Sequence, residues 1–264
     1  MAIKIAFAIQ KGGQAKTTTS VITAEILARA GYNTLLIDLD SQANATTMVS
    51  GKSMYEFEGR TVYEAMEEND PLPYLNVPKD NLCFLAADDM MALFSRHIYT
   101  SGLRNPAGVL KRAISQVESE FDFIIMDCPP ALSDIVTNAI VYADYIIMPM
   151  DAGDFGEDAI ERFMKFVNTA KEAGHTKAEV LGILFTLRDT RSSHEKKIIK
   201  TISKQFPGIP FKAQIRKRAK IKEAAKKGVQ LISKADDKVY TDYLNFVEEL
   251  IERIARKEGG KNSE

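Results

Sequence analysis

The sequence predicts an α/β fold, a doubly wound, mostly parallel β-sheet with helices on both faces. Short apolar runs alternate along the chain with longer segments in which apolar residues recur every three or four positions, the pattern of strands separated by helices. The runs show little polar alternation, as expected for parallel strands buried on both faces. No internal repeat and no long linker divides the chain. We therefore expect one domain over residues 1–257 and a polar tail at residues 258–264.

The first half of the chain contains the less regular part of this pattern. A helix is expected at residues 17–30, which carry an apolar face and end at Gly31, a typical C-cap. Residues 109–117 carry a second apolar helical face. The stretch 41–80 is punctuated by glycine and proline, and a short helix is expected within it at residues 62–67. Strands are expected at the apolar runs 3–9, 34–39, 82–87 and 121–127.

The second half repeats the alternation with fewer interruptions. Apolar runs predict strands at residues 145–150 and 180–186. A basic helix is expected at residues 192–206. The last helix, at residues 236–257, carries a long apolar face that we expect to pack on the sheet. The remaining helices are expected at residues 133–142 and 159–173.

Composition bounds the classes of protein to consider. The 264 residues are 45% hydrophobic, which is ample for a core, and the net charge of −1 indicates no global attraction to nucleic acid or membranes. Cys83 and Cys128 have no metal-site spacing, and the first residues form a strand rather than a signal peptide. No apolar run approaches the ~20 residues of a membrane span. We expect a soluble cytoplasmic protein with reduced thiols.

The segment between the first strand and the first helix has the layout of a phosphate-binding loop. The apolar run stops at Lys11-Gly12-Gly13, and a helix begins at Lys16. Adjacent glycines let several backbone N–H groups point into one concavity, and the helix N-terminus adds partial positive charge. Lys16 can then bridge phosphate oxygens while the Thr17 hydroxyl binds magnesium. The residues predicted to bind a nucleoside triphosphate are Lys11, Gly12, Gly13, Gln14, Ala15, Lys16, Thr17 and Thr18.

This loop departs from the common pattern G-x-x-x-x-G-K-[ST]. Gln10 stands at the position of the first glycine and Ala15 at that of the second. The loop has instead a second lysine, Lys11, upstream of Lys16. A lone Lys-Gly-Gly would indicate a surface turn, but the preceding strand, the following helix and the Lys16-Thr17 pair favour a nucleotide site.

Acidic residues follow two other predicted strands. Asp38 and Asp40 end the second strand, and their side chains share one side if the strand continues through Asp40. Asp127 ends the apolar run at residues 121–127. Acids are common where chains turn, but an acid after an apolar strand is also the usual magnesium-side partner of a phosphate loop. Beside such a loop, Asp127 is expected near the metal, and Asp38 is expected to orient the loop or the metal's water shell.

These motifs resemble the ParA/MinD deviant-Walker ATPases, also called signature-lysine P-loop ATPases. The resemblance covers essentially the whole chain. It comprises Lys11-Gly-Gly-x-x-Lys16-Thr-Thr, Asp38-x-Asp40-x-Gln42, Asp127-x-Pro-Pro130, Asp189-Thr-Arg191 and residues 215–228. It implies the P-loop NTPase fold of that family and an ATPase that uses ATP and Mg²⁺.

The resemblance also implies a role for each matching residue. Lys16 and Thr17 contact phosphate and magnesium. Asp40 acts on the attacking water, and Asp127 lies near the metal. Lys11 reaches across an ATP-sandwich homodimer to the partner's phosphates, so dimerisation would depend on ATP. The expected catalytic residues are Lys11, Lys16 and Asp40, and the expected metal-side residues are Thr17, Asp38 and Asp127.

Ala15 departs from the family pattern, which usually has glycine next to the phosphate-binding lysine. If this residue needs a positive φ, alanine costs roughly 1 kcal/mol or more. Its methyl group also narrows the approach to phosphate. We expect phosphate binding to be retained and turnover to be slow.

A basic segment helps to distinguish between branches of the family. Residues 188–227 contain fourteen Lys or Arg and three acids. Such a run is often a solvated helix face, but this excess of positive over negative side chains is too large to be balanced by local ion pairs. It favours contact with the phosphate backbone of nonspecific double-stranded DNA. By resemblance, Arg191 and Lys220 stand where ParA-type proteins carry DNA-binding arginines, and Arg216 replaces a common proline. The expected DNA-binding residues are Arg191, Arg216, Lys217, Arg218, Lys220 and Lys222.

The expected function is that of a short ParA-type DNA-partitioning ATPase without an N-terminal DNA-reading domain, since the loop motif begins at residue 10. It would dimerise with ATP, coat nucleoid DNA, and be released when a ParB-like centromere-binding partner stimulates hydrolysis. The alternative is a MinD-like membrane-associated positioning ATPase, which ends in an amphipathic helix. Residues 257–264 hold nothing to insert into a bilayer. An iron–sulfur reductase is disfavoured because Cys83 and Cys128 lack glycine-rich surroundings.

Overall fold

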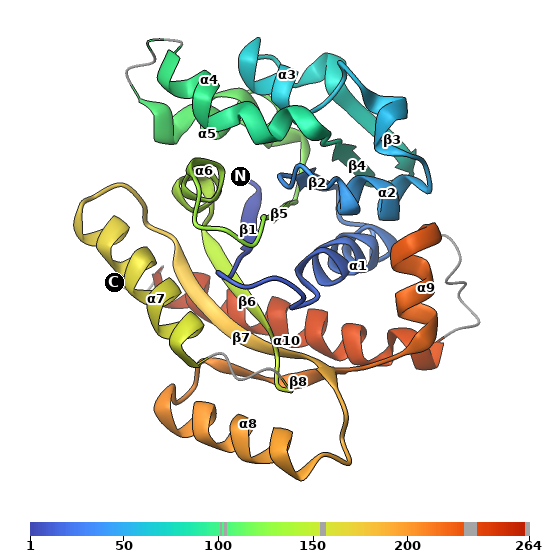
Figure 1. The fold of residues 1–264 in the computed structure, drawn as a ribbon, viewed down its shortest axis with the longest axis vertical. Helices are drawn as coiled ribbons and strands as arrows, with labels where there is room; N and C mark the ends of the chain where they lie inside the picture. The colour runs from blue at the N-terminus through green and yellow to red at the C-terminus, as the bar shows by residue number, and fades with distance from the viewer. Residues whose placement is uncertain (101, 103–104, 154–156, 230–236, 262–264) are drawn as a thin grey trace.

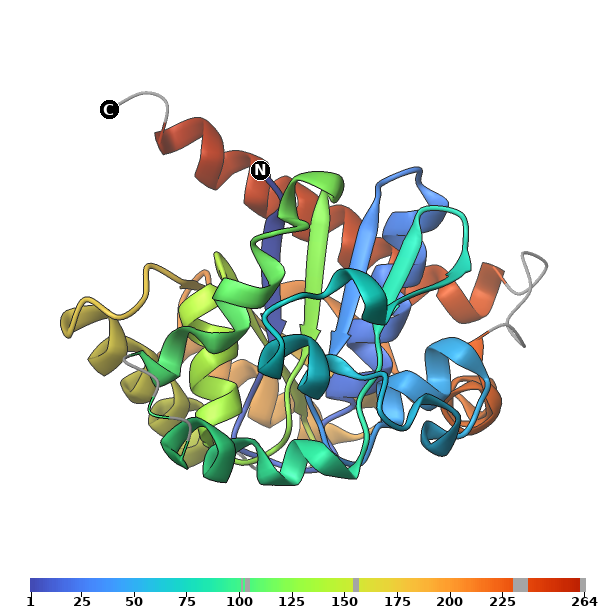
Figure 2. The same cartoon turned by 90° about the horizontal axis from the view of Figure 1, so that it is seen from above.

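One eight-stranded sheet forms the centre of the protein in the computed structural model, which describes residues 1–100, 102, 105–153, 157–229 and 237–261. The strands are β1 (Ile3–Phe7), β2 (Thr34–Asp38), β3 (Leu75–Lys79), β4 (Leu82–Leu85), β5 (Phe123–Asp127), β6 (Tyr145–Asp151), β7 (Glu179–Arg188) and β8 (Pro210–Arg216). Their order across the sheet is β3-β4-β2-β5-β1-β6-β7-β8. Figures 1 and 2 show helices on both faces of this sheet.

The sheet is parallel except at one edge, where β3 pairs antiparallel with β4. β1 lies at the centre, between β5 and β6. The register places Asp127 opposite Phe7 on β1 and opposite Asp38 on β2. The carboxyl ends of these strands therefore meet at one edge of the sheet, where doubly wound folds bind ligands. The predicted fold class is confirmed.

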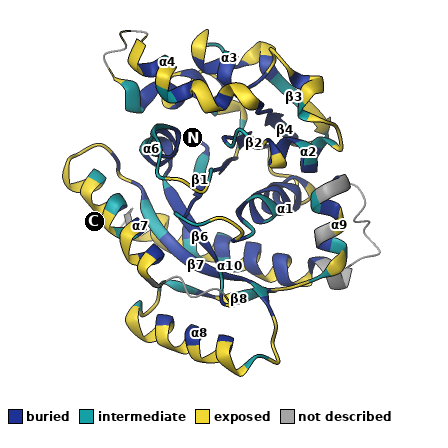
Figure 3. Cartoon of the chain, viewed as in Figure 1, coloured by how far each residue is buried: buried dark blue, intermediate teal, exposed yellow. Residues whose placement is uncertain are grey.

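Each face of the sheet is covered by its own apolar cluster, and Figure 3 shows the inner strands largely buried. The first cluster is covered by α3 (Val62–Glu67), α4 (Phe94–Thr100), α5 (Val109–Ile114), α6 (Asp134–Tyr142), α7 (Glu157–Glu172) and α8 (Ser193–Gln205). The second is covered by α1 (Lys16–Arg29), α2 (Asn44–Ser50), α9 (Ala219–Lys227) and α10 (Asp237–Lys261). The 3₁₀ helices are η1 (Met54–Phe57), η2 (Leu72–Tyr74), η3 (Asp89–Leu93), η4 (Pro106–Gly108) and η5 (Glu118–Glu120).

Local capping explains why the short helix at residues 62–67 could be predicted inside an irregular stretch. The Thr61 hydroxyl accepts a hydrogen bond from the Tyr63 amide at 3.2 Å. The Thr61 amide in turn donates to Glu64 Oε2 at 2.9 Å, which completes a capping box. The observed bounds of α3 coincide with the predicted ones.

Five elements were not predicted: β3, β8, α2, α4 and α9. β3 contains Pro78, which argues against a strand unless the strand lies at a sheet edge, as here. β8 is the opposite edge strand and mixes Phe211 and Ile215 with polar residues, so it lacks a continuous apolar run. α9 buries Ile221 and Ala224 and is otherwise basic, which conceals its helical period.

Helix α10 extends beyond the predicted end at residue 257 and reaches Lys261. Residues 258–261 are therefore helical rather than part of a polar tail, and residues 262–264 lie outside the described part of the chain. The extra turn is fixed by side chains, because the Tyr145 hydroxyl donates to Glu258 and Lys257 pairs with Glu179 at 2.6 Å. The apolar face of α10 packs on the sheet as predicted, with Tyr243, Phe246 and Leu250 buried.

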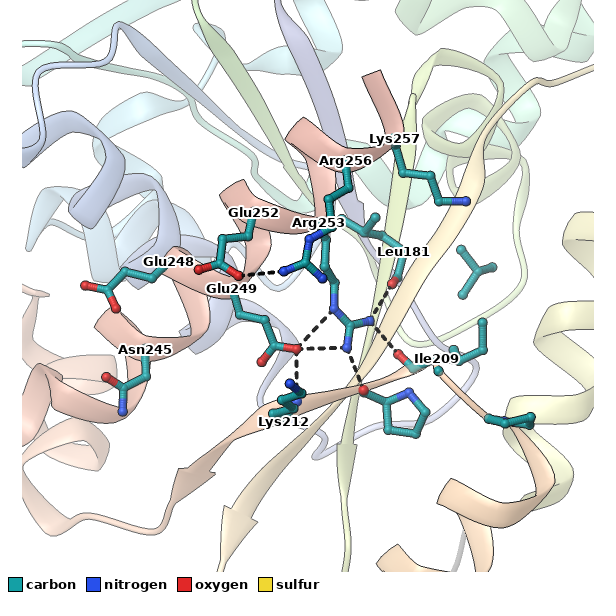
Figure 4. Close-up of a pocket in the computed structure, with 14 residues that line it drawn as sticks. Leu181, Ile209, Lys212, Asn245, Glu248, Glu249, Glu252, Arg253, Arg256 and Lys257 are labelled. Atoms are coloured by element: carbon teal, nitrogen blue, oxygen red, sulfur yellow. Dashed lines mark hydrogen bonds and ion pairs between the residues drawn. The ribbon is translucent and has the colours of Figure 1, made fainter. Parts of the chain in front are cut away.

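The guanidinium group of Arg253 links α10 to β7 and β8 through hydrogen bonds (Figure 4). Arg253 donates to the carbonyl oxygens of Leu181, Ile209 and Pro210 at 3.0, 2.8 and 2.6 Å. It also pairs with Glu249 at 2.8 Å. These residues line an open pocket of about 840 Å³. Because three backbone carbonyls meet one side chain there, this network holds the fold together.

The same Glu249 carboxylate caps the edge strand β8. It accepts hydrogen bonds from the consecutive amides of Lys212 and Ala213 at 3.0 and 2.9 Å. Arg253 lies 4.1 Å from the ring centroid of Phe211, which adds a cation–π contact. Helix α10 thus holds β8 through polar as well as apolar contacts.

Replacing Arg253 with alanine is expected to lower the free energy of unfolding by about 3 kcal/mol, because it leaves Glu249 and three carbonyl groups without their partner. Urea unfolding followed by circular dichroism measures this change. Arg256→Ala is the matched control, since Arg256 is exposed and pairs with Glu252 on the surface, where about 0.5 kcal/mol is expected. Equal losses in the two variants would contradict the assigned role of Arg253.

Candidate nucleotide site and basic surface

The predicted phosphate loop connects the carboxyl end of β1 to the amino terminus of α1, at the centre of the sheet. Gly13 has φ of 74° and Ala15 has φ of 56°, so the backbone curls as predicted. The Thr19 amide and hydroxyl both donate to the Ala15 carbonyl oxygen, at 3.0 and 2.7 Å. The φ of Ala15 lies in the left-handed region, which glycine adopts more easily and which costs alanine about 1 kcal/mol or more of conformational free energy.

Lys16 lies inside this loop rather than on its surface. It is 7% exposed, and its Nζ donates to the Lys11 carbonyl oxygen at 2.8 Å. Burial lowers the pKa of Lys16, while the negative charges of Asp127 and Asp40 act in the opposite direction. An anion bound in the loop would supply this buried ammonium with further partners.

Asp127 is the most unusual carboxylate of the site. It is fully buried, and among the described residues no group donates a well-formed hydrogen bond to either of its oxygens. Burial and the neighbouring charge of Asp38 raise its pKa to about 8. The nearby hydroxyls of Thr17 and Ser20 and the charge of Lys16 oppose that rise. A buried acceptor without a donor is costly unless a cation or water meets it.

The other two acids differ in burial and in contacts. Asp38 is 1% exposed, and burial raises its pKa to about 6. Strand β2 ends at Asp38, so the condition for Asp38 and Asp40 to share one side of a continuing strand is not met. Instead the Asp40 amide turns back to donate to Asp38 Oδ1 at 3.2 Å. Asp40 itself is partly exposed and accepts from the Gln42 amide at 3.0 Å.

Thr46 is a site residue that the sequence did not indicate. Its amide and its hydroxyl each donate to Asp38 Oδ2 at 2.8 Å. The same hydroxyl accepts from the Ala87 amide at 2.9 Å. Thr46 therefore joins β2, α2 and the chain after β4. The contact with Ala87 joins residues that are 41 positions apart, so no local motif could have revealed it.

The predicted basic surface lies at the carboxyl ends of β7 and β8. The chain after these strands lines an open pocket of about 360 Å³, with residues 188–191 on one side and residues 216–218 on the other. Arg188 is buried and forms an ion pair with Glu195 of α8. Its carbonyl oxygen accepts from the Lys217 amide at 3.1 Å, which joins the two segments.

The predicted DNA-binding residues are not equally available on this surface. The Arg191 side chain is 91% exposed and has a 3.4 Å contact with Asp189. Arg216 pairs with Asp242 of α10 through its Nε at 2.9 and 3.0 Å, so much of its charge is neutralised. Arg218 is half-buried, and among the described residues nothing accepts a hydrogen bond from its Nε. The other three are the exposed Lys217, the half-buried Lys220 on α9, and Lys222, whose side chain lies outside the described residues.

Within the described part of the chain, no helix is both long enough and apolar enough to cross a membrane. In the same residues no three His, Cys, Asp or Glu side chains gather as a ready-made metal cluster. Cys83 is half-buried and Cys128 is buried, and neither forms a disulfide.

Residues 2–180 match the family model described as an AAA domain. The chain is 28% identical over 231 residues to the chromosome-partitioning ATPase Soj of Treponema pallidum, covering 87% of this chain and 88% of that protein. The solved structure of apo McdA from Cyanothece has a TM-score of 0.84 and 22% identity over 95% of this chain and 100% of that chain, a likeness of fold.

A third similar protein is cobyrinic acid a,c-diamide synthase from Mycobacterium smegmatis, solved with an ATP analogue and magnesium. Its TM-score is 0.77 and its identity 25%, over 86% of this chain and 92% of that chain. The family match includes the loop at residues 11–18 and the ends of β2 and β5, which carry Asp38 and Asp127. The chain therefore belongs to the AAA domain family and is one of its ParA/MinD-type ATPases.

Proposed function

We propose that the protein is a ParA-type DNA-partitioning ATPase. It binds ATP with magnesium, forms an ATP-dependent homodimer, and binds nonspecific double-stranded DNA on the nucleoid in the cytoplasm. A ParB-like centromere-binding partner stimulates hydrolysis and so releases it from DNA. The observation that carries the proposal is the orphaned, buried carboxylate of Asp127 beside a curled phosphate loop and the buried ammonium of Lys16.

The nucleotide site is built from the loop and from the ends of β2 and β5. The amides of residues 11–18 and Lys16 hold the phosphates. Thr17 and Asp127 fit Mg²⁺, which prefers oxygen ligands and often takes one or two carboxylates together with substrate phosphates. Asp38 is fixed by Thr46, which suits a group that orients the metal's water shell. The metal, when bound, offsets negative charge on the phosphates.

Hydrolysis in this scheme depends on positioning and electrostatics more than on covalent chemistry. Asp40 is partly exposed at the mouth of the site, where it orients the attacking water. The Lys11 backbone is held inside the loop, since its amide donates to the Ile9 carbonyl oxygen at 2.8 Å. Its partly exposed side chain reaches the phosphates of the partner protomer in the dimer.

DNA binding uses the surface formed by residues 188–191, residues 216–218 and α9. Arg191, Lys217 and Lys220 contact the phosphate backbone, which carries no sequence information, so binding is nonspecific. Two protomers paired through ATP would place two such surfaces on one dimer. Affinity for DNA then depends on ATP because pairing does.

A MinD-like membrane role receives less support. Such proteins insert a terminal amphipathic helix into the bilayer surface. The apolar side of α10, the last helix among the described residues, is not available for this, because Tyr243, Phe246 and Leu250 are buried against the sheet. The polar side of α10 carries both signs of charge, including Glu252 and Arg256.

Lys220→Glu is expected to weaken ATP-dependent DNA binding by tenfold or more while leaving the dimer intact. The slope of log affinity against log salt should fall by about one per lost phosphate contact. Co-sedimentation with DNA measures the change, and parallel samples with anionic liposomes should stay in the supernatant. Lys111→Glu is the matched control, since it makes the same charge change at an exposed position on α5. Equal DNA affinity in both variants, or sedimentation with liposomes alone, would contradict the proposal.

A further inference from the structure

Gln14 is a buried polar residue inside the phosphate loop, and its side chain is engaged at both ends. It is 2% exposed. Its Nε2 donates to the Gly12 carbonyl oxygen at 3.0 Å, within the loop. Its Oε1 accepts from the Asp151 amide at 2.7 Å, at the end of β6. The side chain therefore clamps one turn of the loop to a neighbouring strand.

The backbone of the same residue is attached to a second strand. The buried Thr186 hydroxyl, on β7, donates to the Gln14 carbonyl oxygen at 3.1 Å. Asp151 is itself held by a local turn, because its carboxylate accepts from the Gly153 amide at 2.8 Å. Gln14 thus links the loop to β6 and β7, which are long and almost wholly buried strands.

This attachment adjoins the one strained position of the loop. Ala15 has φ of 56°, in the left-handed region that costs an alanine free energy. A strained backbone persists when its surroundings fix it by several independent contacts. The three hydrogen bonds of Gln14 are such contacts, and they act on the residue immediately before Ala15.

We propose that Gln14 is a positioning residue that holds the phosphate loop in its binding shape before nucleotide arrives, and so offsets the strain at Ala15. This inference rests on the proposed nucleotide site. The side chain acts through the loop backbone and not on the phosphates, since its polar atoms bond to Gly12 and Asp151. When the binding shape is only partly populated, the apparent dissociation constant rises in proportion.

Gln14→Leu is expected to raise the dissociation constant for ATP about tenfold, the equivalent of about 1.4 kcal/mol. The turnover rate at saturating ATP should fall by a smaller factor than the affinity, because bound nucleotide restores the loop. Hydrogen exchange of the amides at residues 11–16 should be faster than in the unsubstituted protein without ATP and equal to it with ATP. Isothermal titration and steady-state kinetics separate the two effects.

A double-mutant cycle with Ala15→Gly tests the offsetting of strain. Glycine adopts positive φ without the penalty of alanine. The substitution should raise affinity by a larger factor in the Gln14→Leu background, where it recovers most of the loss, than in the unsubstituted protein, whose loop is already held. Gln14→Met keeps the length of the side chain and removes both amide groups without adding charge, so it should give a loss like that of Gln14→Leu and remains available if Gln14→Leu does not fold. Gln205→Leu on α8 is the control for loss of a glutamine that pairs elsewhere.

Wild-type affinity in both Gln14 variants would overturn the inference. It would also be overturned if Ala15→Gly changed affinity by the same factor with and without Gln14, or if loop exchange were unaltered. A lower turnover rate with unchanged affinity would point to a catalytic role instead. If the unsubstituted protein bound no ATP, the proposed function would fail, and the exchange rates without nucleotide would still test Gln14.

Discussion

Replacing Lys16 with alanine is expected to abolish ATP binding at millimolar concentration. The lysine is buried, lies at the start of α1, and shares the site with the carboxylates of Asp127 and Asp40. Removing one partner of a buried charge arrangement costs roughly 3–5 kcal/mol, which corresponds to at least a hundredfold in affinity. Titration calorimetry with a non-hydrolysable ATP analogue measures the loss.

The control for this variant is Lys165→Ala, which removes an exposed lysine from α7. Circular dichroism should report the same fold for both proteins. Normal ATP affinity in Lys16→Ala would refute the assignment of residues 11–18 as the phosphate loop, and with it the proposed function.

Replacing Asp40 with alanine is expected to leave ATP binding and dimerisation in place and to lower the hydrolysis rate at saturating ATP by about a hundredfold or more. Asp40 is partly exposed and accepts a hydrogen bond from the Gln42 amide at 3.0 Å, whereas Lys16 and Asp127 are buried. Removing Asp40 should therefore disturb the position of the attacking water more than it weakens the binding of the phosphates. Phosphate release and sedimentation equilibrium measure the two properties separately.

Asp40→Asn separates the charge of Asp40 from its structural contact. The amide oxygen of asparagine can still accept from Gln42, so the local turn is kept while the negative charge is lost. Loss of turnover in both variants would assign the effect to the carboxylate. Hydrolysis at the original rate in Asp40→Ala would remove this residue from the mechanism.

The central part of the fold could be predicted because its signals are local. The strands β1, β2 and β5 are continuous apolar runs, and α3 carries a capping box within four residues. The edge strands could not be predicted in the same way. β3 contains Pro78, which an edge strand tolerates, and β8 mixes apolar and polar residues, so neither strand gives a continuous apolar run.

The candidate site, like the fold, could be predicted only in part. The curled backbone could be predicted from the adjacent glycines of residues 11–18, and the condition set on Ala15, a positive φ, is fulfilled in the structure. The contacts of Thr46 with Asp38 and Ala87 could not be predicted from the sequence, and neither could the burial of Gln14. Thr46 and Ala87 stand 41 positions apart, and Gln14 and Asp151 stand 137 apart, so only the packed sheet brings these pairs together.

The two ends of the sheet are closed to further strands by different means. At the β3 end, Pro78 has no N–H group to offer an incoming chain. At the β8 end, the amides of Lys212 and Ala213 are already taken by the Glu249 carboxylate. Exposed strand edges otherwise act as templates for aggregation. At these positions, an incoming strand of a second molecule would find no free N–H group with which to extend the sheet.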